Sequence, residues 1–180
     1  MGLKSTFGAA VPLPPPSAVP TAPHILPVSV VFQEETRWCW AACCEMLFKY
    51  FNFSNDSKCQ IASNVFSQSC CTNPASCNLG QLASHVFWHF SFPFQPKDDD
   101  LAESEVHDEI AADRPVEVLW RWNGGFDAHL VLIIGVYPTG DLEIIDPREY
   151  YGQNRFSYEA VQDADGLGEW IYSYFELNQV

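Results

Sequence analysis

One short stretch, FQEETRWCWAACCEMLFKY (residues 32–50), places a cysteine between two tryptophans at the expected start of a helix. A thiol is a strong nucleophile when a neighbouring imidazole accepts its proton and a helix N-terminus favours the thiolate. Residues from about Trp38 to Tyr50 have the apolar spacing of a helix, so Cys39 lies where its first turn should begin. Cys39 is therefore the candidate nucleophile, and its partners must come from elsewhere in the chain.

Two later residues could supply the imidazole and the group that orients it. His129 opens the strand-like segment AHLVLIIGVY, and Asp146 ends the next one, DLEIID. The PTGD sequence between these segments predicts a turn, and a hairpin would bring the start of one strand beside the end of the other. We then expect His129 and Asp146 to be cross-strand neighbours. His129 would act as general base and acid, and Asp146 would hold the imidazole in the required tautomer.

A glutamine six residues before the thiol adds a hydrogen-bond donor to this set. Acyl transfer develops a negative oxygen in the transition state, and fixed donors around that oxygen are usually the largest electrostatic contribution. The side-chain amide of Gln33 could fold back beside the backbone N–H of Cys39. Together, these two groups would form an oxyanion hole.

The elements that must position these residues divide into a helical half and a strand-rich half. Before Pro115, four segments have apolar residues at helical spacing, and after it the segments become β-branched or alternating. Helices first and strands second indicate an α+β fold with segregated layers rather than repeated βαβ units. The expected helices span residues 38–50, 58–66, 79–90 and 101–113, and the expected strands span 116–120, 128–137, 141–146 and 169–177.

In order and context, the four candidate positions resemble the motifs of the papain-like cysteine peptidases. The segments WCWAACCEM, KCQIASNVF, SCCTNPASCN, AHLVLIIGV and LEIIDP look most like the bacterial papain-like effector proteases, and are also similar to the peptidases that cut double-glycine leader peptides. The resemblance implies a papain-like fold. In it, an N-terminal helical half packs against a C-terminal antiparallel sheet half, with the active-site cleft between them. The implied roles are Cys39 as nucleophile, His129 as base and acid, Asp146 as orienter and Gln33 in the oxyanion hole.

The same resemblance implies hydrolysis of peptide bonds through a Cys-His-Asp triad and an acyl-enzyme intermediate, with a protein or peptide as substrate. A secreted bacterial effector or toxin is one setting for such an enzyme. An amidase or acyltransferase could use the same residues. A non-catalytic binding module could retain the scaffold, but it would be expected to have lost one of the four residues. Specificity should come from cleft walls built by loops 67–78, 91–100 and 121–128.

Composition narrows the range of partners. The chain has 180 residues and a formal net charge of -14, from 23 acidic and 9 basic residues. Nucleic acid and anionic membrane surfaces would therefore repel it. No apolar run approaches the roughly 20 residues that a membrane span needs. We expect a soluble monomer that works without a cofactor.

Six cysteines remain when Cys39 is set aside, and their even number allows fifteen pairings among which the sequence cannot choose. Cystines would imply that the protein works in an oxidising place, and a reduced state is the alternative. A zinc site of Cys70, Cys71 and Cys77 with His85 and His89 is a further alternative, but the spacing matches no common zinc pattern. The six are Cys43, Cys44, Cys59, Cys70, Cys71 and Cys77.

The first 27 residues differ in composition from the rest. They contain seven of the thirteen prolines and one charged residue, Lys4. We therefore expect residues 1–27 to form an extended linker and residues 28–180 to form the catalytic domain. The prolines interrupt any signal-peptide core, which favours secretion without a cleaved signal, with a cytoplasmic location as the alternative. The start MGLKST also fits the pattern for myristoylation of Gly2.

Overall fold

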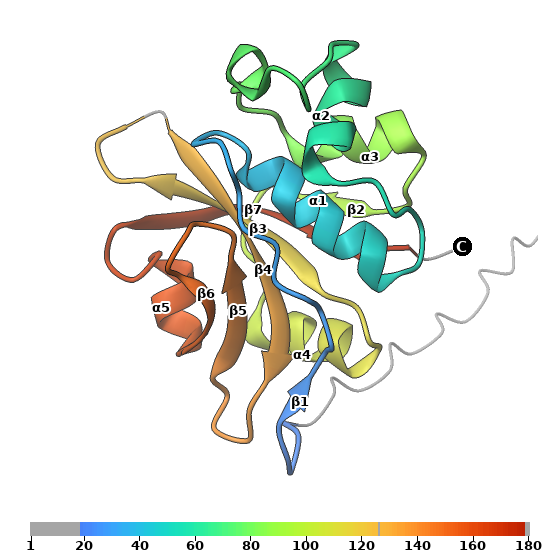
Figure 1. The fold of residues 1–180 in the computed structure, drawn as a ribbon. Helices are drawn as coiled ribbons and strands as arrows, with labels where there is room; N and C mark the ends of the chain where they lie inside the picture. Colours follow the sequence, from blue (N-terminus) through green and yellow to red (C-terminus); the bar gives the residue numbers. More distant parts are fainter. Residues whose placement is uncertain (1–18, 126, 179–180) are drawn as a thin grey trace, which may run out of the picture.

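Helices fill the first part of the chain and strands the second, as the sequence predicted (Figure 1). The computed structural model describes residues 19–125 and 127–178. The helices are α1 (Cys39–Tyr50), α2 (Lys58–Phe66), the 3-10 turn η1 (Pro74–Cys77), α3 (Ala83–Phe90) and α4 (Glu103–Ala111). All four expected helices are present, with some ends shifted by a few residues. None of the helices in the described part of the chain has the length and apolarity needed to cross a bilayer.

An antiparallel sheet forms the second half of the fold. Its main strands are β2 (Gln95–Lys97), β3 (Val116–Trp122), β4 (Ala128–Val136), β5 (Leu142–Asp146), β6 (Gly152–Phe156) and β7 (Gly168–Phe175), in the order β2-β7-β3-β4-β5-β6. The predicted α+β fold, with a helical half and an antiparallel sheet half, is therefore confirmed. The sequence did not reveal β2, β6 or the short helix α5 (Tyr158–Gln162), because these segments are short and mostly exposed or half-buried.

The hairpin between β4 and β5 closes through the predicted turn. The N–H of Tyr137 donates to the carbonyl of Asp141 at 2.9 Å, and the N–H of Gly140 donates back to Tyr137 at 2.9 Å. Gly140 has a φ of 85°, a conformation that a residue without Cβ adopts at little cost. The PTGD sequence thus fixes which strand follows β4 in the sheet.

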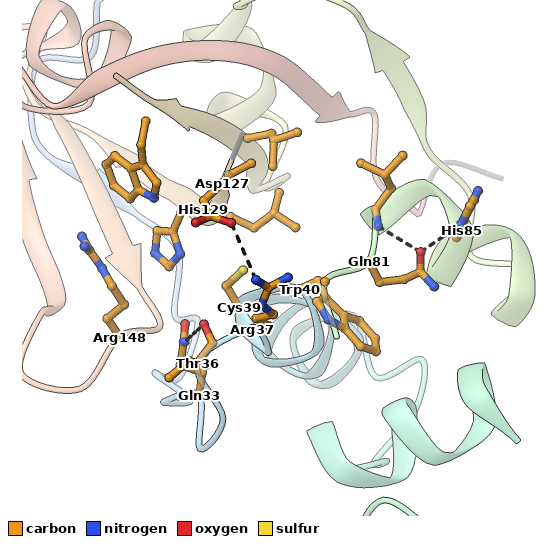
Figure 2. A pocket seen from close by; sticks show the side chains of 16 residues that line it. Gln33, Thr36, Arg37, Cys39, Trp40, Gln81, His85, Asp127, His129 and Arg148 are labelled. Atoms are coloured by element: carbon orange, nitrogen blue, oxygen red, sulfur yellow. Dashed lines mark hydrogen bonds and ion pairs between the residues drawn. The ribbon is translucent and has the colours of Figure 1, made fainter. Parts of the chain in front are cut away.

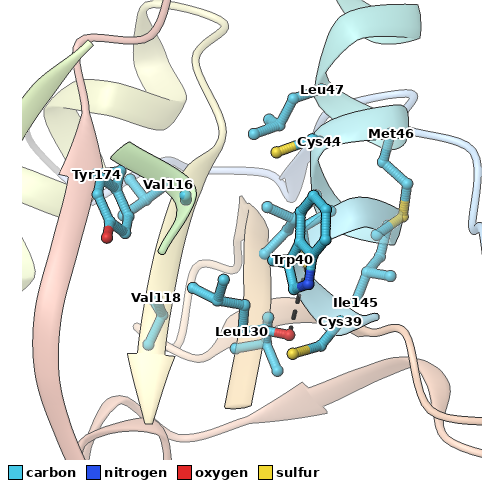
Figure 3. Packing of buried hydrophobic residues seen from close by; sticks show 14 of the residues in the cluster. Cys39, Trp40, Cys44, Met46, Leu47, Val116, Val118, Leu130, Ile145 and Tyr174 are labelled. Atoms are coloured by element: carbon cyan, nitrogen blue, oxygen red, sulfur yellow. Dashed lines mark hydrogen bonds between the residues drawn. The ribbon is translucent and has the colours of Figure 1, made fainter. Parts of the chain in front are cut away.

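Helix α1 is almost completely buried. All ten residues from Cys39 to Phe48 are buried, because the helix packs against α2, α3 and β4. Figure 3 shows Cys44 and Leu47 of α1 directed toward the sheet, in which β3 carries Val116 and β4 carries Leu130. Full burial of a side chain such as Leu47 stabilises a protein by about 1.5–3 kcal/mol. Packing of this helix therefore fixes its first residue against the sheet.

One irregularity interrupts the pairing of β4 with β5. Gly135 pairs with Glu143, but the next residue of β5, Ile144, pairs with Ile133. Ile134 is thus an extra residue in β4, which makes this position a β-bulge. Directly opposite residues of the two strands share a face and side chains alternate along each strand, so the extra residue changes which residues of β4 share a face with a given residue of β5.

A short N-terminal strand, β1 (His24–Ile25), covers this bulge. It pairs with the end of β4, and its Ile25 lies opposite Gly135. The N–H of the following residue, Leu26, donates to the carbonyl of Ile134 at 2.7 Å. Leu26 is 3% exposed, so it also adds an apolar side chain to the core.

Residues 24–26 therefore belong to the packed domain, although the sequence placed them in the linker. Their short apolar run among prolines gave no strand pattern long enough to detect. The rest of the division into a linker and a catalytic domain stays a prediction. Residues 1–18 lie outside the described part of the chain, and so does the proposed lipidation site at Gly2.

Gly135→Ala should displace β1 from the bulge. A Cβ at this position would lie 2.9 Å from the carbonyl oxygen of His24 and 3.0 Å from the Cα of Ile25. We expect the free energy of unfolding to fall by about 1–3 kcal/mol in urea denaturation, the usual cost of overpacking. Gly80→Ala is the control, because a Cβ there meets nothing within 4 Å. Equal stability of the two variants would contradict this close packing.

Candidate active site

A cleft of about 680 Å³ opens where the start of α1 meets β3 and β4 (Figure 2). Cys39 and His129 both line it, with the segment before α1 and residues 80–85 forming other parts of the wall. Of the three loops expected to build the walls, 121–128 contributes lining residues. Among the residues that the structure describes, none from 67–78 or 91–100 lines the cleft.

Cys39 is the first residue of α1, as the sequence predicted. The N–H groups of a first helical turn have no partner within the helix, and they favour negative charge nearby. Two indole N–H groups hold this helix start in place: Trp38 donates to the carbonyl of Cys77 at 2.8 Å, and Trp40 donates to the carbonyl of Leu79 at 3.0 Å. The two tryptophans beside the thiol are therefore structural anchors that fix its position.

His129 hydrogen-bonds Asp146 and lies near Cys39. Its Nε2 lies 2.8 Å from Oδ1 of Asp146, and Cys39 lines the cleft with it, close enough to raise the pKa of the same ring. Because Asp146 occupies Nε2, Nδ1 is the nitrogen left for the thiol. His129 is 5% exposed and Asp146 is 6% exposed. The structure thus brings together three of the four residues that the sequence singled out.

Burial and hydrogen bonding act in opposite directions on the charges of this pair. Burial lowers the pKa of His129, but the hydrogen bond with Asp146 and the nearby Cys39 outweigh burial and raise the pKa above the ordinary 6.5. Burial raises the pKa of Asp146, but hydrogen bonds from His129 and Arg148 outweigh it and lower the pKa below the ordinary 3.8. The imidazolium and the carboxylate are therefore both favoured where the two side chains meet.

The bulge in β4 determines that His129 and Asp146 share one face of the sheet. Beyond the bulge Leu132 pairs with Ile145, so continuing this register puts Asp146 opposite Val131. Residues two apart in a strand lie on the same face, so His129 is on the face of Asp146. Without the extra residue, Asp146 would fall opposite Leu132 and His129 would project to the other face. The two residues are diagonal neighbours, a detail that the predicted hairpin alone does not give.

Asp146 has a further partner that the sequence analysis missed. Arg148 donates from Nε and Nη2 to Oδ2 of Asp146, at 2.9 and 2.6 Å, and its backbone N–H donates to Oδ1 at 2.9 Å. One buried carboxylate therefore accepts hydrogen bonds from an imidazole and from a bidentate guanidinium. The available signal was the DPRE sequence, which places a cation two residues after the candidate carboxylate.

Planar side chains are layered beside this network. The ring of Trp122 stacks on His129, with centroids 5.8 Å apart and planes at 19°. The guanidinium carbon of Arg148 lies 5.2 Å from the centroid of Trp122 and 4.0 Å from that of Tyr151. Trp122 and Tyr151 were not singled out by the sequence analysis, yet both rings contact the guanidinium that pairs with Asp146.

Gln33 lines the cleft with Cys39, but its amide is directed into its own loop. Nε2 donates to the carbonyls of Glu35 and Thr36, both at 3.0 Å, and Oε1 is buried without a partner among the described residues. Both amide hydrogens are thus in use, and an oxyanion role for Gln33 requires the amide to rotate. The backbone N–H of Gln33 donates to Pro147 at 2.7 Å, which ties this loop to the segment that follows β5.

Four of the six cysteines other than Cys39 form two disulfides, so the interpretation of these cysteines as cystines is confirmed for these four. The bonds are Cys59–Cys71 and Cys70–Cys77, and the free thiols are Cys39, Cys43 and Cys44. The disulfides use all three cysteines of the alternative zinc site, so that alternative is wrong. They tether the loop whose Cys77 carbonyl anchors the indole of Trp38.

A buried carboxyl group lies beneath α1. Glu117 of β3 is fully buried, and neither of its carboxyl oxygens has a hydrogen-bond partner among the described residues. Burial, together with the nearby Cys39, raises the pKa of Glu117 well above the ordinary 4.5. The neutral form of Glu117, which places no negative charge close to the thiol, is therefore favoured.

Solved structures with the same fold are peptidases. The chain is similar to the peptidase domain of Streptococcus ComA, a bi-functional ABC transporter involved in quorum sensing, with a TM-score of 0.62, 20% identity, and coverage of 87% of this chain and 99% of that one. A putative C39-like peptidase from Bacillus anthracis gives a TM-score of 0.57 at 14% identity, covering 84% and 96%. A double glycine motif protease from an AMS/PCAT transporter, in complex with the leader peptide, gives 0.53 at 17% identity, covering 87% and 96%. The fold is thus that of a papain-like peptidase.

A family model makes the identification more specific. Residues 23–160, more than half of the chain, match the family described as papain-like cysteine protease AvrRpt2. The chain belongs to this family and is a cysteine peptidase, as the motif resemblance implied. Comparison with curated proteins gives no match.

Asp146→Asn should lower the free energy of unfolding by about 2 kcal/mol near pH 5, because a charge-assisted hydrogen bond to His129 is lost. The His129 contribution is fully present below pH 6.5 and is lost as pH rises through the raised pKa. The Asp146 contribution is present above pH 3.8 and is lost as pH falls through the lowered pKa. Urea denaturation near pH 9 should therefore show a smaller effect of the substitution than near pH 5.

Asp141→Asn is the control for this pH dependence. Asp141 pairs with Arg155, whose guanidinium keeps its charge over the whole range. Its effect on stability should therefore be similar near pH 5 and near pH 9. If the effect of Asp146→Asn were also the same at both pH values, the charge coupling between Asp146 and His129 would be absent.

Proposed function

We propose that this peptidase cleaves peptide bonds through Cys39, His129 and Asp146, with an acyl-enzyme intermediate on Cys39. The observation that carries the proposal is the arrangement of three side chains at the cleft. Cys39 at the helix N-terminus lines the cleft with His129 and lies close enough to raise its pKa, and His129 lies 2.8 Å from Asp146. A nucleophile, a base and an orienting carboxylate are the groups that such chemistry needs. Membership in a cysteine protease family supports the same reaction class.

In the proposed reaction, Sγ of Cys39 attacks the carbonyl carbon of the substrate while its proton passes to Nδ1 of His129. Asp146 holds the ring through Nε2, and the raised pKa of His129 favours the imidazolium that forms. The tetrahedral intermediate collapses when the C–N bond breaks and His129 gives its proton to the leaving amine. Water, deprotonated by His129, then hydrolyses the thioester and restores the thiol.

The negative oxygen of the tetrahedral intermediate would lie at the start of α1. The backbone N–H of Cys39 belongs to the first helical turn and is the first donor there. We assign Gln33 as the second donor, acting after substrate entry turns its amide away from the carbonyls of Glu35 and Thr36. The buried, unpartnered Oε1 of Gln33 supports this assignment, because the present orientation leaves one polar atom unsatisfied.

We also propose that the substrate is a protein or peptide outside the producing cell, as for an effector or toxin. The two disulfides support this setting, because disulfides form and persist in oxidising environments. A reducing cytoplasm would open them and release the loop that anchors Trp38. Secretion therefore fits the cystines better than a cytoplasmic location does.

Cys39→Ala should reduce turnover by at least about 1000-fold, because the nucleophile is removed while binding groups remain. The measurement is a proteome-wide search for new N-termini after the protein is added to a cell extract. Cys43→Ala is the matched control: Cys43 is a free, buried thiol one turn further along α1 and should be dispensable for cleavage. New termini that persist with Cys39→Ala would refute the proposed nucleophile. Deamidated side chains without new termini would indicate an amidase instead.

A further inference from the structure

We propose that Arg148 is a positioning residue for this reaction, which keeps Asp146 ionised and correctly turned while the charge of His129 changes. The inference rests on the proposed roles of Cys39, His129 and Asp146. It assigns to Arg148 an action through the Asp146 carboxylate, without contact with the substrate.

Four hydrogen bonds join Arg148 to the carboxylate of Asp146. Oδ2 accepts from Nε at 2.9 Å and from Nη2 at 2.6 Å, and Oδ1 accepts from the backbone N–H at 2.9 Å and from Nε at 3.2 Å. Oδ1 is also the oxygen that faces Nε2 of His129. A planar guanidinium that holds both oxygens fixes the rotation of the carboxylate, and with it the direction in which Oδ1 meets the imidazole.

Arg148 also provides a positive charge beside Asp146 that does not change during the proposed reaction. Asp146 is buried, and a buried carboxylate without a counter-charge is costly. His129 neutralises this charge only while the imidazole is protonated, and in the proposed reaction it gives that proton to the leaving amine. A guanidinium stays protonated throughout. Asp146 therefore keeps a counter-charge in the half of the cycle in which His129 is neutral.

Two aromatic rings hold the guanidinium in the orientation that this task requires. Its carbon lies 4.0 Å from the centroid of Tyr151 and 5.2 Å from that of Trp122. Contacts between a cation and an aromatic face are attractive, and a planar guanidinium can also stack on the ring. Because Trp122 stacks on His129 as well, the same indole contacts both cationic partners of Asp146.

Direct substrate binding is the competing role, because the Arg148 side chain is 30% exposed and lines the cleft. Its charge, however, is already paired by the Asp146 carboxylate at 2.6 Å. An anionic substrate group would have to share the guanidinium with a buried carboxylate that also orients His129. This arrangement favours positioning over recognition.

The test is a double-mutant cycle of Arg148→Met and Asp146→Asn, read as the rate at which iodoacetamide alkylates Cys39 near neutral pH. Each single substitution should slow alkylation by about 10-fold, the loss expected for one charge-assisted hydrogen bond. The double variant should be no slower than Asp146→Asn, because Arg148 acts through Asp146. In Arg148→Met, ¹³C NMR of the Asp146 carboxyl should show its pKa raised by about one unit.

Two further variants complete the design. Arg148→Lys keeps the positive charge but loses the planar guanidinium with its several N–H donors, so it should recover part of the alkylation rate that Arg148→Met loses. It also serves as the test variant if Arg148→Met does not fold. Arg155→Met is the matched control, because Arg155 pairs with Asp141 and lies 4.0 Å from the Tyr137 centroid in the same manner. It is not among the residues that line the cleft, so its loss should leave the alkylation rate unchanged.

Additive losses in the double variant, or an unshifted pKa of Asp146, would overturn this inference. So would a loss seen only with the anionic reagent iodoacetate, because Arg148 would then act by attracting anions into the cleft. Different results would refute the proposed role of Asp146 and the proposed role of Arg148. If Asp146→Asn left alkylation unchanged, the proposed role of Asp146 would fail and this inference with it. If Asp146→Asn slowed alkylation and Arg148→Met did not, only this inference would fail.

Discussion

The bulge at Ile134 is the constraint on which the candidate site depends. It shifts the pairing of β4 with β5 by one residue, so His129 and Asp146 share a face and approach to 2.8 Å. β1 supports this irregularity, because the Leu26 N–H satisfies the Ile134 carbonyl. Gly135 leaves the space that β1 needs. A segment outside the hairpin thus helps to hold His129 and Asp146 together.

The thiol itself is held from the other side of the cleft. Burial of α1 fixes its axis, and the indoles of Trp38 and Trp40 bond to carbonyls in and after the disulfide-tethered loop. Two buried carboxyl groups near the site differ in their environment. Hydrogen bonds from His129 and Arg148 lower the pKa of Asp146, whereas burial raises the pKa of Glu117 beneath the same helix. Cys39 is thus positioned by its buried helix, and the buried carboxylate of Asp146 hydrogen-bonds the imidazole beside the cleft.

The sequence predicted the elements with strong periodicity and the residues with distinctive chemistry. α1, β4 and β5 followed from apolar spacing, and Cys39, His129 and Asp146 followed from thiol chemistry and strand order. The bulge was not predictable, because β4 is buried on both faces and an extra isoleucine leaves no break in its pattern. β1 is too short and too rich in neighbouring prolines to show a strand pattern. The cysteine count could not show which residues pair, because Cys43 and Cys44 are buried in α1 as small apolar residues and stay free.

The most direct test of the central claim is peptide mapping after brief exposure to iodoacetamide near neutral pH, in the wild type and in His129→Gln. The geometry predicts that, of the three free thiols, only Cys39 is modified rapidly, because burial raises the pKa of Cys43 and Cys44 well above 9.0. His129→Gln should slow that modification by at least about 10-fold, since no imidazole remains to accept the thiol proton. Equal modification of Cys39 in the two proteins, or faster modification of either other thiol, would contradict the claim that His129 activates Cys39.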